Sequence, residues 1–123
     1  MDFAHVTLLV KNLEESLRFY QEVIGLPVKR RFSPMPGLEI VFLGNGETEI
    51  ELISDQTKSD IDYGQAVSLG FSVQSLEEAA ERMKEMGIKV GQIFSPSPQV
   101  NYFFVSDPNG LRIQLIEWIK EKH

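Results

Sequence analysis

Two side chains in the first half of the sequence could bind a metal ion together. His5 lies in the run FAHVTLLV, and Glu51 lies in the hexapeptide TEIELI, residues 48–53. An imidazole nitrogen and a carboxylate oxygen are good ligands for divalent first-row metals such as Ni, Zn, Mn or Fe. In an enzyme with such a site, Glu51 or a bound water would move the substrate's proton, so Glu51 is the candidate catalytic residue.

From the residues alone, structural roles for the same side chains are favoured over a metal site. His5 can be a partly buried histidine that donates to a backbone carbonyl, and Glu51 can form a salt bridge with Arg112. A carboxylate on an enclosed face requires a cation nearby, which either a metal ion or an arginine would supply.

The hexapeptide that contains Glu51 has a near-copy later in the chain. LRIQLI, residues 111–116, repeats the alternation of TEIELI but has Gln114 in place of Glu51, at an offset of 63 residues (114 − 51). The segments VKNLEE (10–15) and VQSLEE (73–78) align at the same offset (73 − 10). This shared offset indicates an internal duplication.

Both halves have the same predicted order of elements, β-α-β-β-β. Asn12 and Ser75 are good helix N-caps, each with a glutamate three residues later, and Gly25 and Gly87 end the helical patterns. The strands predicted after the helices are LPVKRRF, LEIVFLG and TEIELI in the first half, and IKVGQIF, VNYFFVS and LRIQLI in the second. We therefore predict one α+β domain of two βαβββ modules, about 1–54 and 66–123, joined by a polar linker.

Each module would leave one face of its sheet without a helix. Two joined modules would give a curved, mostly antiparallel sheet around a concave cavity, with the helices outside and a small molecule within. Because strand residues alternate sides, His5 and Glu51 should face the cavity, and the offset adds Ser68 and Gln114. The other predicted pocket residues are Thr7, Phe103 and Arg112.

Composition excludes several classes of function. The 123 residues are enough for one domain, and the net charge of −6 argues against a nucleic-acid partner. The absence of cysteine excludes disulfides, thiolate metal sites and cysteine nucleophiles. Without a leader-like start or an apolar run of membrane length, we expect a cytoplasmic protein with no membrane partner.

Three segments resemble the vicinal oxygen chelate superfamily: HVTLLVKNLEESLRFYQEVIGL, EIELI and DPNGLRIQLIE. That superfamily includes glyoxalase I, methylmalonyl-CoA epimerase, extradiol dioxygenases and the fosfomycin- and bleomycin-resistance proteins. The resemblance covers nearly the whole chain and implies the paired βαβββ fold. It also implies a homodimer, in which modules of two chains commonly build each cavity.

The glyoxalase I branch takes four metal ligands from four equivalent strand positions, which by resemblance are His5, Glu51, Ser68 and Gln114. Ser68 replaces a usual histidine and Gln114 a usual glutamate. The implied reduced site, His5, Glu51 and Gln114, would bind one Ni, Zn, Mn or Fe ion weakly. Leu9 replaces the arginine that usually anchors the glutathione carboxylate, and the extradiol dioxygenase ligand set is also incomplete.

The resemblance therefore favours a protein that binds a small organic molecule in its cavity and has an incomplete metal site. The alternative is a metal-dependent, glyoxalase-like lyase or isomerase that uses His5, Glu51 and Gln114. A non-catalytic interaction module is a third reading.

Overall fold

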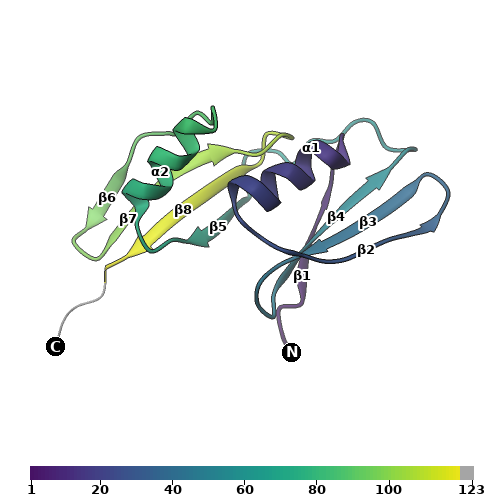
Figure 1. Cartoon of the computed structure of the whole chain (residues 1–123), viewed down its shortest axis with the longest axis horizontal. Coiled ribbons are helices and arrows are strands. Elements are labelled where there is room, and N and C mark those ends of the chain that lie inside the picture. Colours follow the sequence, from purple (N-terminus) through teal and green to yellow (C-terminus); the bar gives the residue numbers. More distant parts are fainter. Residues whose placement is uncertain (120–123) are drawn as a thin grey trace. The chain divides into compact units, whose positions relative to one another are not determined.

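The computed structural model describes residues 1–119, and the chain divides into two compact units (Figure 1). The first unit is Met1–Asp62, and the second begins at Tyr63. Each unit contains a four-stranded sheet and one helical segment, which confirms the predicted α+β class and the order β-α-β-β-β. The concave cavity between joined modules stays a prediction.

The first unit has the strand order β1-β4-β3-β2, and the second has β5-β8-β7-β6. In both sheets the first strand is parallel to the last strand of its module, and the other pairs are antiparallel. The elements are β1 (His5–Leu9), α1 (Leu13–Arg18), η1 (Phe19–Val23), β2 (Val28–Met35), β3 (Leu38–Leu43), β4 (Glu49–Asp55), β5 (Ser68–Ser72), α2 (Leu76–Glu85), β6 (Phe94–Ser97), β7 (Val100–Ser106) and β8 (Arg112–Trp118).

Both helices begin and end where the sequence predicts. The side chains of Asn12 and Ser75 accept from the backbone N–H three residues later, at 3.0 Å and 3.2 Å. Gly25 and Gly87 follow the helical segments with φ of +92° and +80°, a conformation that favours glycine. The sequence did not reveal that α1 continues as a π-helical segment, η1.

Each sheet buries the face that its helix covers, since α1 contacts β4 and α2 contacts β8. Ile50 and Leu52 of β4 are 6% and 0% exposed, and Ile113 and Leu115 of β8 are 0% and 2% exposed. The residues between them alternate to the opposite side, which we call the helix-free face of each unit. This face carries His5, Thr7, Phe42, Glu49 and Glu51 in the first unit, and Ser68, Gly70, Phe104, Ser106, Arg112 and Gln114 in the second.

The strand register confirms the offset of 63 residues. Thr7 pairs with Glu51 between β1 and β4, and Gly70 pairs with Gln114 between β5 and β8. Residues 63 positions apart therefore have the same pairing partners in the two modules, with no insertion or deletion in these strands.

The strand predicted over IKVGQIF is mostly wrong. Strand β6 is Phe94–Ser97, and before it Gly91 donates from its backbone N–H to Phe104 O at 3.1 Å. A Cβ atom at Gly91 would lie 3.0 Å from that carbonyl oxygen, so only glycine permits this approach without a shift. Among residues 1–119, no helix is long and apolar enough to cross a membrane.

Candidate functional site

The helix-free face of the first unit brings three predicted site residues together. His5 Nε2 lies 3.6 Å from Glu51 Oε1, and the Thr7 hydroxyl donates to the same oxygen. The Glu51 side chain is 14% exposed and that of His5 is 41% exposed. The ring of Phe42 meets His5 edge-on, with 5.6 Å between centroids. We call these four residues the His5–Glu51 cluster.

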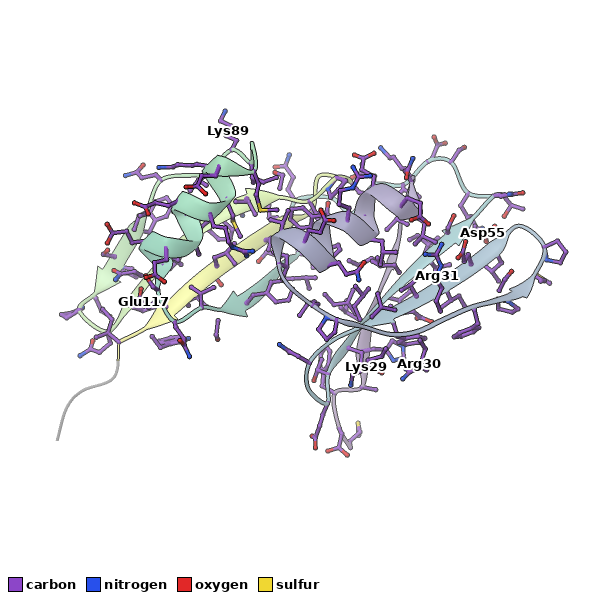
Figure 2. All side chains as sticks on the ribbon, viewed as in Figure 1. Lys29, Arg30, Arg31, Asp55, Lys89 and Glu117 are labelled. Carbon is purple, nitrogen blue, oxygen red and sulfur yellow. The ribbon has the colours of Figure 1, made fainter. Side chains whose placement is uncertain are left out.

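A second carboxylate on the same face, Glu49, is already neutralised. Arg30 Nη2 lies 2.8 Å from Glu49 Oε1, and Lys29 Nζ lies 3.6 Å from Glu49 Oε2. Both cations belong to β2 (Figure 2). The hydrogen bond from Arg30 is the main reason that the pKa of Glu49 is below its usual value. Glu49 is therefore committed to its own ion pairs.

The helix-free face of the second unit has different chemistry at the equivalent positions. The guanidinium of Arg112 lies 4.1 Å from the centroid of the Phe104 ring. Gln114 lies against Gly70, where a Cβ atom would come within 3.2 Å of Gln114 Oε1. Ser68 is exposed and pairs in register with Arg112. The predicted residues Ser68, Arg112 and Gln114 thus share one face of one sheet.

Phe103, expected in the pocket lining, lies in the hydrophobic core. Its side chain is 0% exposed and pairs in register with the buried Leu115 on the face that α2 covers. Alternation along β7 places Tyr102 and Phe104 on the helix-free face instead. Their rings contact each other edge-on at 5.7 Å.

The first unit supplies two of the three predicted metal ligands. Within residues 1–119, no group of three His, Cys, Asp or Glu side chains is placed to hold a metal ion. His5 and Glu51 are one nitrogen and one oxygen ligand, whereas a catalytic zinc site has three protein ligands. Gln114, the third predicted ligand, belongs to the second unit, so its part in a metal site stays a prediction.

Two aromatic residues of these faces were not identified as site residues from the sequence. Phe42 contacts His5, and Phe104 supports Arg112. The strand pairing could have indicated both, because Phe42 pairs in register with Glu51 and Phe104 with Gln114.

Comparisons with known proteins agree with this fold. Residues 2–115 match the family described as the Glyoxalase/Bleomycin resistance protein/Dioxygenase superfamily. A lactoylglutathione lyase of Neisseria meningitidis is 34% identical over 125 residues, which cover 95% of this chain and 91% of that relative.

Two solved structures share the fold at lower sequence identity. A trypanothione-dependent glyoxalase I of Leishmania major has a TM-score of 0.81 and 24% identity, covering 95% of this chain and 86% of that one. An antibiotic binding protein of a Streptomyces species has a TM-score of 0.79 and 18% identity, covering 96% of both chains. The chain belongs to the glyoxalase/bleomycin resistance protein/dioxygenase superfamily.

Proposed function

We propose that this glyoxalase-like protein binds a small organic molecule at its helix-free faces and does not depend on a tightly held metal ion. One observation carries the proposal. The two modules share one strand register, yet Ser68 and Gln114 occupy the places that His5 and Glu51 occupy in the first module. A hydroxyl and a neutral amide are poor substitutes for an imidazole and a carboxylate as ligands of a first-row metal.

The His5–Glu51 cluster is suited to hold an organic ligand directly. Thr7 and His5 both approach Oε1 of Glu51, so Oε2 can accept from a hydroxyl or amino group of a ligand. The Phe42 ring beside them offers an apolar contact. A ligand with an apolar body and a hydrogen-bond donor fits this arrangement.

The second candidate is a metal-dependent lyase or isomerase. Two observations favour it: the 34% identity to a lactoylglutathione lyase, and the 3.6 Å approach of His5 to Glu51. In that function Glu51 would accept the proton of the substrate. A homodimer, which the resemblance implies, and a cytoplasmic location, which the sequence predicts without the resemblance, are part of both proposals.

Calorimetric titration of metal-stripped protein with Ni, Zn and Mn separates the two candidates. The variants are His5→Ala and Glu51→Gln, and Glu49→Gln is the matched control because Arg30 already neutralises that neighbouring carboxylate. We expect dissociation constants in the millimolar range for all three metals. Micromolar binding that is lost in both cluster variants and kept in Glu49→Gln would overturn the proposal in favour of the lyase.

The binding function itself is tested by NMR with a library of small organic fragments. We expect fragments to shift the backbone amide signals of Thr7 and Glu51 in the wild-type protein. The shifts should weaken in Glu51→Gln and persist in Glu49→Gln. A library that leaves both helix-free faces unchanged would contradict the proposed function.

A further inference from the structure

Equivalent positions on the two helix-free faces differ in charge. Three positions of β1 and β4 carry one imidazole and two carboxylates, whereas their counterparts on β5 and β8 carry a hydroxyl, a guanidinium and an amide. The counterparts are His5 and Ser68, Glu49 and Arg112, and Glu51 and Gln114. At these three positions the first unit therefore carries two carboxylates, and the second carries one guanidinium and no carboxylate.

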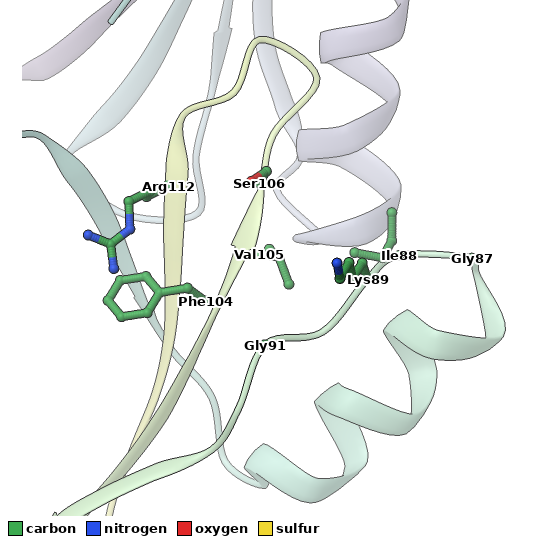
Figure 3. A pocket seen from close by; sticks show the side chains of 8 residues that line it. All are labelled: Gly87, Ile88, Lys89, Gly91, Phe104, Val105, Ser106 and Arg112. Carbon is green, nitrogen blue, oxygen red and sulfur yellow. The ribbon is translucent and has the colours of Figure 1, made fainter. Parts of the chain in front are cut away.

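Arg112 differs from the arginine that occupies a similar environment in the first unit. Arg30 lies 4.3 Å over the Phe42 ring and forms an ion pair with Glu49. The guanidinium carbon of Arg112 lies 4.1 Å from the centroid of the Phe104 ring. Figure 3 shows the two side chains next to each other. Arg112 has no ion pair within residues 1–119. A guanidinium held beside a ring and without an ion pair keeps its planar donor fork for two hydrogen bonds to a carboxylate or phosphate.

Two serine hydroxyls flank Arg112 on the neighbouring strands. Ser68 of β5 and Ser106 of β7 both pair in register with Arg112 of β8. Side chains paired in this way lie roughly 5 Å apart at their Cβ atoms. In the part of the chain that the structure describes, neither hydroxyl has a hydrogen-bond partner, so both are free to donate to a ligand.

Arg112 and Ser106 also line a cavity of about 500 Å³ in the second unit (Figure 3). None of its eight lining residues is acidic, and Lys89 adds a second positive charge. Figure 3 shows Lys89 on the Val105 side of β7, whereas the Arg112 guanidinium lies with Phe104 on the other side, so Arg112 is the cation of the helix-free face here. The lining residues are Gly87, Ile88, Lys89, Gly91, Phe104, Val105, Ser106 and Arg112.

The two carboxylates nearest to Arg112 along the chain, Asp107 and Glu117, both accept backbone hydrogen bonds, Glu117 from Leu76 N–H at 2.8 Å. Asp107 is 5% exposed, and its Oδ1 accepts from the backbone N–H groups of Asn109 and Leu111, each at 2.8 Å. These bonds hold the carboxylate in the turn between β7 and β8. The guanidinium of Arg112 therefore remains available for an external anion.

We infer that the second unit has an oxyanion-binding site, in which Arg112 and the hydroxyls of Ser68 and Ser106 bind a carboxylate or phosphate group of a small molecule. Phe104 positions the guanidinium, and the Gln114 amide, two residues along β8 on the same face, lies close enough in register to contact the rest of the ligand. This inference rests on the proposed function and names its ligand class: an organic anion.

The test uses benzoate, phenylphosphonate and the neutral benzamide as probes of the full-length, ¹⁵N-labelled protein. NMR titrations follow the Arg112 Nε–H signal and the backbone amides of Ser68 and Ser106. Because a charge-assisted, bidentate contact is lost with the neutral probe, we expect at least one anion to bind about tenfold more tightly than benzamide. Added salt should weaken that preference. A preference for benzoate identifies a carboxylate site, and a preference for phenylphosphonate a phosphate site.

Three variants complete the design. Arg112→Gln should lower the affinity for the preferred anion to that of benzamide, and Arg112→Lys should restore part of it, since lysine keeps the charge without the planar fork. Arg30→Gln is the matched control, because that arginine is also stacked on a phenylalanine but is paired with Glu49, and its affinity should equal the wild-type value. Dispersed amide spectra show that each variant is folded.

Equal affinities for benzoate, phenylphosphonate and benzamide would overturn the inference, and so would wild-type anion affinity in Arg112→Gln. The same spectra keep this failure separate from failure of the proposed function. Fragment shifts at Thr7 and Glu51 with none at Arg112 would contradict the oxyanion site alone. Micromolar metal binding would contradict the proposed function and leave the anion preference measurable.

Discussion

Replacing Thr7 with valine removes one hydroxyl group from the His5–Glu51 cluster and leaves a β-branched side chain of similar shape. That hydroxyl donates to Oε1 of Glu51, whose side chain is 14% exposed. Valine and threonine are both favourable in strands, so the change tests the hydrogen bond and not the strand propensity of β1. We expect Thr7→Val to destabilise the folded protein.

The size of the effect follows from the exposure of the two partners. A hydrogen bond to a charged group contributes about 1.5–3 kcal/mol when water cannot replace the donor. Thr7 is exposed, so water can reach the site and take over part of the interaction. We therefore expect a loss of about 1 kcal/mol in the free energy of unfolding, near the middle of the range for ordinary hydrogen bonds.

Urea unfolding followed by far-UV circular dichroism measures this loss. The comparison includes Thr7→Ser, which keeps the hydroxyl, and Glu51→Gln alone and together with Thr7→Val. The double-mutant cycle should give a coupling of about 1 kcal/mol between the two side chains. A coupling below about 0.3 kcal/mol, within the error of additivity, would refute the assigned hydrogen bond.

Three further predictions concern stability. Gly91→Ala should cost about 1–3 kcal/mol because its Cβ would meet the backbone oxygen of Phe104 at 3.0 Å, whereas Gly46→Ala, with nothing within 4 Å, should be near neutral in the same urea experiment. Glu117→Ala should cost about 1–2 kcal/mol, because Glu117 Oε1 accepts at 2.8 Å from the first backbone N–H of α2; an unchanged urea midpoint would contradict this contact. Burial raises the pKa of Tyr63 to about 12, so the folded protein holds the phenol proton more tightly than the unfolded chain does. The resulting contribution to folding stability is complete below the ordinary tyrosine pKa of about 10 and is lost as the pH rises through about 12. Tyr63→Phe should abolish that part of the pH dependence, which urea midpoints between pH 9 and 12 would reveal.

The fold was predictable because its signals are local and repeated. N-cap residues, terminating glycines and alternating strands each specify one element, and the shared offset of 63 residues ties the halves together. The π-helical segment η1 was not predictable, since its residues have an ordinary helical pattern. Gly91 was read as part of a strand, because a close backbone approach leaves no trace in hydrophobic periodicity.

The site was predictable only where one strand pair decides the geometry. Parallel pairing of β1 with β4 brings Thr7 beside Glu51, as the alternation indicated. Which cation meets Glu49 depends instead on β2, whose register against β3 shifts between Val28 and Arg30. The face of Phe103 was ambiguous for another reason. Strand β7 has aromatic residues on both of its sides, so hydrophobicity does not indicate whether Phe103 or Phe104 is buried.

Because β1–β4 and β5–β8 pair in the same register, a side chain of one module can be placed at the equivalent position of the other. Backbone hydrogen bonds and buried residues maintain the pairing, so the side chains of the helix-free faces can change in sets while the architecture is kept. Placing the residues of positions 5, 49 and 51 at positions 68, 112 and 114 would give a chain with two acidic faces. The reverse exchange would give a chain with two basic faces. The same changes can arise during evolution, so the side chains of one module can come to bind a new ligand while those of the other module are kept.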